Sequence, residues 1–179
     1  MLDQLLNLVK ENAQDLIVNN GAVPNQFNNA AINETVSAIK YQLSGAVANG
    51  NLQDVLGIFG NAQNLQSNPL VGNIVSQLSG SLGSKFGVDG VQAQQIASQL
   101  IPQILGSLVS KTNNPSDTSF NINDIVSQLS GGNLQGIDFG QVVSQMQSGK
   151  GVDFGGLASQ LLGGNKGGLG DMLGSFFGK

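Results

Sequence analysis

The chain has no cysteine, no histidine and no arginine among its 179 residues. Without thiol or imidazole groups it lacks the means for disulfides, for thiolate or imidazole metal sites, and for Ser-His-Asp or Cys-His catalysis. Arginine is the bidentate donor that phosphate and base-edge recognition favours, and the net charge is −4, so nucleic acid is a poor partner. We therefore expect a protein that is not an enzyme and uses no metal or cofactor.

Long apolar runs are missing as well. No window of the chain approaches the roughly 18 consecutive apolar residues of a spanning helix. The first residues, MLDQLLNLVKENAQDL, carry Asp3 and then polar residues every third or fourth position, a pattern typical of an amphipathic helix rather than a secretory signal. The sequence thus predicts a cytoplasmic protein without a transmembrane segment.

Charged residues make up only 10% of the chain, whereas apolar residues make up 40%, enough for one domain with a core. Before residue 130 the apolar residues recur at spacings of three and four, the period of a helical face. No sustained alternation predicts a strand. We expect an all-α fold, a compact bundle of about six helices, with apolar stripes over residues 2–17, 32–47, 52–59, 70–86, 96–108 and 122–129.

Capping residues mark several helix ends. Asn68 followed by Pro69 is typical of an N-cap and a first helical position, and Gly87 suits the residue after a helix. Asp89, with a glutamine three residues later, resembles a capping box. We expect the helix that follows to be kinked at Pro102, because an interior proline removes a backbone hydrogen bond.

Glycine divides the chain into two parts. Eleven of the 26 glycines lie in residues 1–130, and fifteen lie in residues 131–179. We therefore predict a helical domain over 1–130 and a glycine-rich tail of short capped helices over 131–179. Short helices separated by glycines lose much conformational entropy on ordering, so these helices need a surface on which to dock.

A five-residue pattern with Ser-Gln at its centre recurs along the chain. It begins at residues 74, 96, 125, 142 and 157, with apolar residues, mostly aliphatic, at its first, second and fifth positions. In the tail the repeat is longer, because GIDFG at 136–140 returns as GVDFG at 151–155, fifteen residues later. Asp138, Asp153 and Asp171 are each placed to cap a short helix.

The segment LGSKFGVD at residues 82–89, followed by Ala93, the Leu100-Ile101-Pro102 turn and Leu108, resembles the bacterial YidB-like family, domain of unknown function 937. The segments MLDQLL at 1–6 and NLQDVL at 51–56 are similar to the opening of longer family members. The resemblance covers roughly residues 1–130. It implies a small all-helical bacterial protein and carries no catalytic residues over to this chain.

One loop has the alternation of oxygen-bearing residues found in calcium-binding loops: Asp117, Ser119, Asn121 and Asn123. Ile122 stands where the turn glycine should be, and Gln128 replaces the bidentate glutamate. Turn residues followed by an N-cap explain the same letters, so we expect no metal there.

Asparagine, glutamine and serine make up about a third of the chain. Amide side chains both donate and accept, so identical copies can pair without complementary charges. We therefore hypothesise a structural protein whose partner is itself, as a homo-oligomer or polymer, with the anchors Phe139, Phe154, Leu157, Leu161, Met172, Leu173, Phe176 and Phe177. Two alternatives stay open. The tail folds onto its own core or stays disordered, or its amphipathic end binds a membrane surface.

Overall fold

The computed structural model describes residues 2–60, 62–114, 116–117, 119–132, 134 and 137–148. Within them the chain is all-α, and no strand occurs in this described part. Seven α-helices follow one another: α1 (Leu2–Asn12), α2 (Asn28–Ala48), α3 (Leu52–Gly60), α4 (Pro69–Phe86), α5 (Gly90–Thr112), α6 (Ile122–Leu129) and α7 (Phe139–Gln147). Shorter helical turns lie between them: η1 (Gln14–Val18), η2 (Asn25–Phe27) and η3 (Ala62–Ser67).

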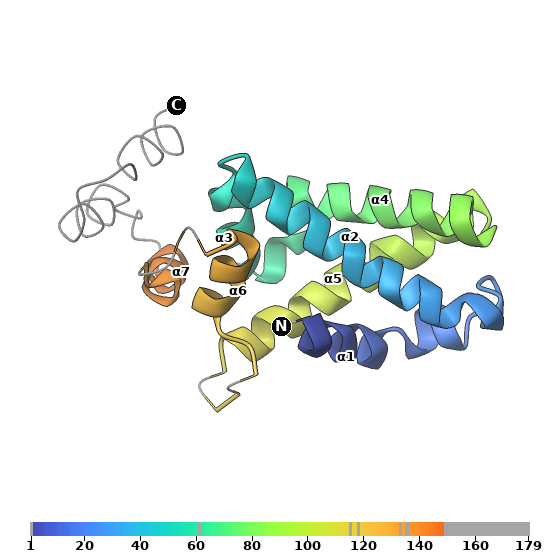
Figure 1. Cartoon of the computed structure of the whole chain (residues 1–179), viewed down its shortest axis with the longest axis horizontal. Coiled ribbons are helices and arrows are strands. Elements are labelled where there is room, and N and C mark those ends of the chain that lie inside the picture. Colours follow the sequence, from blue (N-terminus) through green and yellow to red (C-terminus); the bar gives the residue numbers. More distant parts are fainter. Residues whose placement is uncertain are drawn as a thin grey trace.

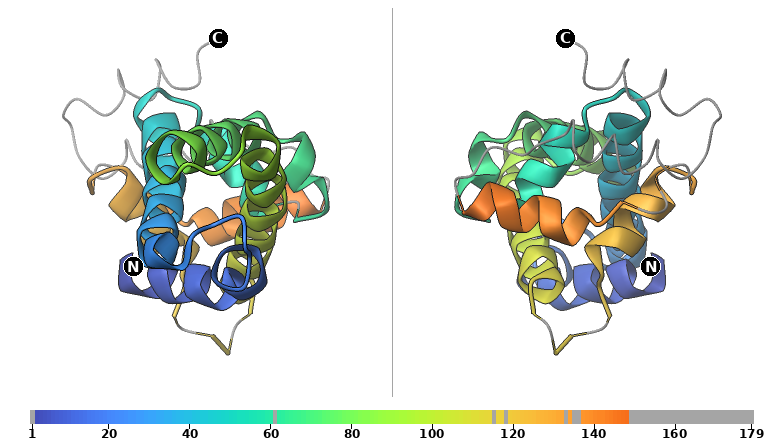
Figure 2. Two further views of the ribbon diagram at one scale, coloured as in Figure 1. Left: turned by 90° about the vertical axis from the view of Figure 1, so that its right-hand side faces the viewer. Right: turned by 90° about the vertical axis from the view of Figure 1, so that its left-hand side faces the viewer.

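Four of the helices form the body of the bundle. Viewed along the long axis, α1, α2, α4 and α5 lie around a common centre (Figure 2, left). At one end of this body lie α3, α6 and α7 (Figure 1), and α7 runs across that end (Figure 2, right). The turn between α4 and α5 lies at the opposite end.

The predicted apolar stripes form the core. On α2 the stripe residues Ile32, Val36, Ile39, Leu43 and Val47 are all buried. The stripes of α3, α4, α5 and α6 are buried too, apart from Phe86, which is half-buried. Phe86 stacks on Phe27 with ring centroids 5.7 Å apart, so an aromatic pair closes the end of the bundle where α4 turns into α5.

The caps predicted at Asn68, Gly87 and Asp89 are present, whereas those predicted at Asp153 and Asp171 lie outside the described residues. Asn68 has an extended backbone, its side-chain oxygen accepts from the backbone N–H of Leu70, and Pro69 begins α4. Gly87 has φ of 71°, the left-handed conformation that glycine adopts at little cost, and it ends α4. The carboxylate of Asp89 accepts from the N–H of Val91 and Gln92 at the start of α5. Helix α5 then continues through Pro102 to Thr112.

Two segments differ from the pattern in the sequence. The first stripe predicts one continuous helix, but α1 ends at Asn12 and the π-helical turn η1 follows. The Asn12 side chain donates to the carbonyl of Leu8 at 2.7 Å and accepts from Ser107 of α5 at 3.1 Å. The Asn12 side chain therefore joins the last turn of α1 to α5 at the point where α1 ends.

The second difference is the connection before α4. The polar composition of residues 61–67 predicts an irregular connection. In the structure residues 62–67 form short helical turns, and Leu65 is only 5% exposed. A Cβ placed on Gly106 of α5 would lie 3.9 Å from the Leu65 side chain. The buried side chain of Leu65 therefore attaches this connection to the core.

Among the described residues, no helix has the length and apolar character needed to cross a membrane.

Candidate docking site on helices α3 and α6

Helix α7 packs against α3 and α6 at one end of the bundle, and we call the surface beneath it the α3–α6 site. Three of its side chains are inserted there: Phe139 is 2% exposed, Val142 1% and Val143 4%. Their spacing of three and four residues places them on one face of the helix. The first short helix of the glycine-rich segment therefore docks on the helical core of its own chain.

Polar contacts fix where α7 begins. The side-chain oxygen of Asn123 on α6 accepts from the backbone N–H of Phe139 at 2.7 Å, and its amide nitrogen donates to Asp138 at 3.4 Å. Asp138 in turn accepts from the N–H of Gln141 at 3.2 Å and so caps α7, as the sequence predicts. One side chain of α6 thus contacts both the cap and the first residue of α7.

Two glycines, Gly140 of α7 and Gly60 of α3, lie where α7 packs closely against the α3–α6 site. A Cβ on Gly140 would lie 3.1 Å from the Asp138 carboxylate and 3.9 Å from Ile122 of α6. At the other end of α7, a Cβ on Gly60, the last residue of α3, would lie 3.5 Å from the Cβ of Met146. Gln147 adds a long hydrogen bond, 3.5 Å, to the carbonyl of Phe59.

The Ser-Gln pattern has the same orientation in all four copies that the structure describes. In α4, α5 and α6 the first, second and fifth residues of the pattern are buried, as at Ile125, Val126 and Leu129. In α7 Val142 and Val143 are buried and Met146 is partly buried against the core. The serine and glutamine between them are exposed or half-buried. The pattern is therefore a docking face, with its polar residues turned outward.

Of the eight predicted self-association residues, the structure describes one. Phe139, the first residue of α7, is buried in the core of its own chain. The other seven, Phe154, Leu157, Leu161, Met172, Leu173, Phe176 and Phe177, lie outside the described residues. The predicted boundary between a domain over 1–130 and a tail over 131–179 stays a prediction, although the packing of α7 carries the core past residue 130.

The residues that resemble a calcium loop have other partners. The Asp117 carboxylate accepts from the N–H of Ser119 at 2.9 Å and lies 3.6 Å from the Lys111 ammonium. The backbone hydrogen bond from Ser119, together with Lys111, holds the pKa of Asp117 below its ordinary value. Asn121 caps α6, and Asn123 binds the start of α7. In the described part of the chain no three acidic side chains gather as metal ligands would.

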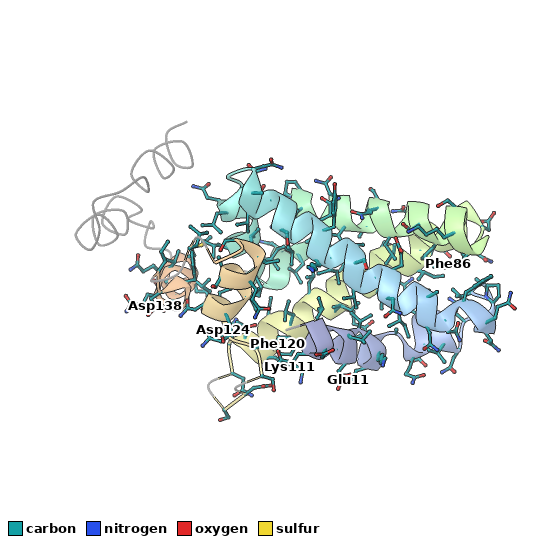
Figure 3. The ribbon with its side chains drawn as sticks, in the orientation of Figure 1. Glu11, Phe86, Lys111, Phe120, Asp124 and Asp138 are labelled. Atoms are coloured by element: carbon teal, nitrogen blue, oxygen red, sulfur yellow. The ribbon has the colours of Figure 1, made fainter. Side chains whose placement is uncertain are left out.

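Two surface cavities lie along the body of the bundle. The larger, about 220 Å³, is lined by Leu16, Asn20, Ala22, Gln92, Gln95, Ile96 and Gln99. The second, about 190 Å³, is lined by Gln4, Asn7, Leu8, Glu11, Lys111, Ser119 and Phe120. Figure 3 labels Glu11, Lys111 and Phe120 around it. Amide and aliphatic side chains dominate the larger cavity, and the smaller one holds a single acid and a single lysine.

The comparisons with known proteins leave the family open. No family model matches the chain, and no curated protein or solved structure matches it either. Membership of the YidB-like family therefore stays a prediction. The site described above rests on the geometry of this chain alone.

Sequence reasoning found the apolar face of α7 and its cap but missed Asn123. The periodic pattern identifies Phe139 and Asp138, because helical spacing and capping are local. The role of Asn123 depends on a contact across sixteen residues with the N–H of Phe139. The sequence singles out Asn123 only as part of the alternation that resembles a calcium-binding loop, and no local signal indicates its contact with α7.

Proposed function

We propose that the protein is a non-enzymatic structural or interaction protein that associates with itself through its helical domain and its glycine-rich tail. The observation that carries this proposal is the docking of α7 by Phe139, Val142 and Val143. The same pattern returns fifteen residues later, with Phe154 and Leu157 at the matching positions. Each chain thus carries a second segment with the docking pattern, in addition to α7, which already occupies the α3–α6 site.

The single α3–α6 site of each chain already holds α7 in the structure. A second docking helix needs an apolar surface as well, because glycine-flanked helices of this length are marginal in water. The α3–α6 site of a neighbouring copy is such a surface, provided that its own α7 gives way to the incoming helix. Contacts of this kind, in which a segment of one copy fits a different surface of the next, build rings or open filaments.

The described surface is suited to contact between identical copies. Two of its four lysines are paired with acids, Lys85 with Glu34 at 2.8 Å and Lys111 with Asp117 at 3.6 Å. Gln42 of α2 donates to Gln77 of α4 at 2.7 Å, an amide pair of the kind that could also form between copies. Low charge weakens the repulsion that keeps identical molecules apart.

Light scattering on size-exclusion fractions tests the proposal with variants of the full chain. The unmodified protein is expected to exceed the monomer mass of 18.4 kDa. Phe154→Ser combined with Leu157→Ser should return it toward that mass, because both changes remove apolar contacts. The matched control, Ser159→Ala with Gln160→Ala, alters the predicted outer face and should leave the mass unchanged.

Three results would contradict the proposal. The first is an unmodified protein that is monomeric throughout, and the second is a double serine variant as large as the unmodified protein. The third is pelleting with lipid vesicles that Phe176→Ser with Phe177→Ser abolishes while the protein stays monomeric. That third result would favour the membrane-surface alternative instead.

A further inference from the structure

Four residues at the start and along the inner face of α7 have counterparts of similar character fifteen positions later. Asp153 matches the cap Asp138, and Phe154 matches the buried anchor Phe139. Leu157 matches Val142, which is 1% exposed. Leu161 matches Met146, whose Cβ lies against Gly60. Residues 151–162 therefore match the cap of α7, its buried anchor and two more of the side chains that face the site.

The steric requirement of the site is matched as well. A Cβ on Gly140 would approach the Asp138 carboxylate to 3.1 Å, so a side chain there would require the capping carboxylate to shift by a few tenths of an ångström. The matching residue of the later segment is Gly155.

Two differences make α7 the better occupant. Val143 is 4% exposed in the site, and its counterpart Ala158 has a smaller side chain that buries less apolar surface. Gln147 donates to the carbonyl of Phe59, and its counterpart Leu162 has no donor. Occupancy by α7 in the structure agrees with this order of preference.

We propose that the α3–α6 site accepts residues 151–162 in place of α7, so that one site has two interchangeable occupants. When the later segment comes from the same chain, α7 is released. When it comes from a second copy, the two chains are linked. The inference rests on the proposed function for its biological use. Exchange of occupants is the step by which a chain whose site holds its own α7 would become joined to a second copy.

The absence of cysteine makes the exchange measurable by disulfide trapping. The Cβ of Met146 lies 3.5 Å from a Cβ built on Gly60, within the range that a disulfide requires. Gly60→Cys with Met146→Cys in the full chain is therefore the positive control and should lock α7. Gly60→Cys with Leu161→Cys is the test, because Leu161 occupies the same position in the later segment.

The negative control is Gly60→Cys with Ser159→Cys. Ser159 matches Ser144, which is exposed on α7, so its thiol should point away from α3. We expect roughly tenfold more disulfide in the Leu161 variant than in this control after mild oxidation, because the bond needs Cβ atoms within about 4.5 Å. Equal yields in these two variants, with full yield in the positive control, would overturn the inference.

Denaturing gels without reductant separate the two sources of the segment. A disulfide within one chain and a disulfide between chains both place residues 151–162 in the site and both support the exchange. Only the second supports self-association. A full yield of the within-chain bond in a protein that stays monomeric would therefore keep this inference and remove the proposed function.

Discussion

The side-chain oxygen of Asn123 on α6 accepts a hydrogen bond of 2.7 Å from the backbone N–H of Phe139, the first residue of α7. The first N–H groups of a helix have no partner within the helix. Here the partner comes from a different helix, and the same asparagine also contacts the Asp138 cap. One amide thereby fixes both the start of α7 and its position on the core.

Asn123→Ala is expected to lower the free energy of unfolding by about 1–2 kcal/mol, because it removes the acceptor for a helix-end donor and the contact to the cap. Asn123→Asp keeps an acceptor but places a second carboxylate beside Asp138, so it should also destabilise. Urea unfolding followed by circular dichroism measures both. Gln128→Ala, at an exposed position of α6, is the control, and a loss as large in that variant would contradict the role of Asn123.

Phe139 and Phe154 should be coupled in stability. Truncating a buried phenylalanine normally costs about 3–5 kcal/mol. We expect Phe139→Ala to cost less than this, because residues 151–162 can take the vacated site. Phe154→Ala alone should be nearly neutral, and the double variant should cost the full amount.

The measurement is a double-mutant cycle on urea unfolding. We predict that the double variant loses more free energy of unfolding than the two single variants lose together. Strict additivity would mean that the two segments do not share a site.

Two glycines of the α4 region should respond in opposite ways to alanine. Gly80 lies inside α4, and a Cβ there meets nothing within 4 Å, so Gly80→Ala should stabilise by about 0.5–1 kcal/mol through helix propensity. Gly87 has φ of 71°, so Gly87→Ala should destabilise by about 1 kcal/mol. Thermal unfolding of the two variants checks both signs, and a shift in the same direction would contradict the account of the α4 end.

Glu34 gives the fold a small dependence on pH. Burial acts to raise its pKa, but hydrogen bonds from Lys85 and Ser81 and the charge of Lys85 outweigh burial, so the pKa lies below its ordinary value of 4.5. A carboxyl group whose pKa is lower in the folded state stabilises the fold above its unfolded pKa. That contribution is lost as the pH falls through the folded pKa.

Glu34→Gln should therefore reduce stability near pH 7 by less than about 1 kcal/mol, since Lys85 is largely exposed. The difference from the unmodified protein should shrink as the pH falls below 4.5 and through the lower folded-state pKa. Urea unfolding across that range measures it, with Asp124→Asn on α6 as a control. A difference that stays constant down to the lowest pH would show that the ion pair is not its source.

The sequence was sufficient to predict the parts of the fold that depend on local chemistry. The apolar spacing of Ile32, Val36 and Ile39 predicts a buried helix face, and all three are buried. Asn68 and Asp138 are predicted and observed as caps, because a cap is defined by residues two or three positions away.

Long-range contacts could not be predicted in this way. The break after α1 accompanies a hydrogen bond from Ser107 to Asn12, 95 residues apart in the sequence. Leu65 is the one large apolar residue in the polar stretch 61–67, and its burial depends on packing of this turn against α5, which lies far along the chain. The α3–α6 site needs Gly60 and Asn123 from separate helices, and neither residue belongs to the apolar pattern of a helix face.

The central claim is that copies of this chain associate, and sedimentation velocity of the unmodified full chain over a series of concentrations tests it most directly. We predict species heavier than 18.4 kDa that lose mass on dilution, as association between identical copies requires. A single species of 18.4 kDa at every concentration would contradict the claim.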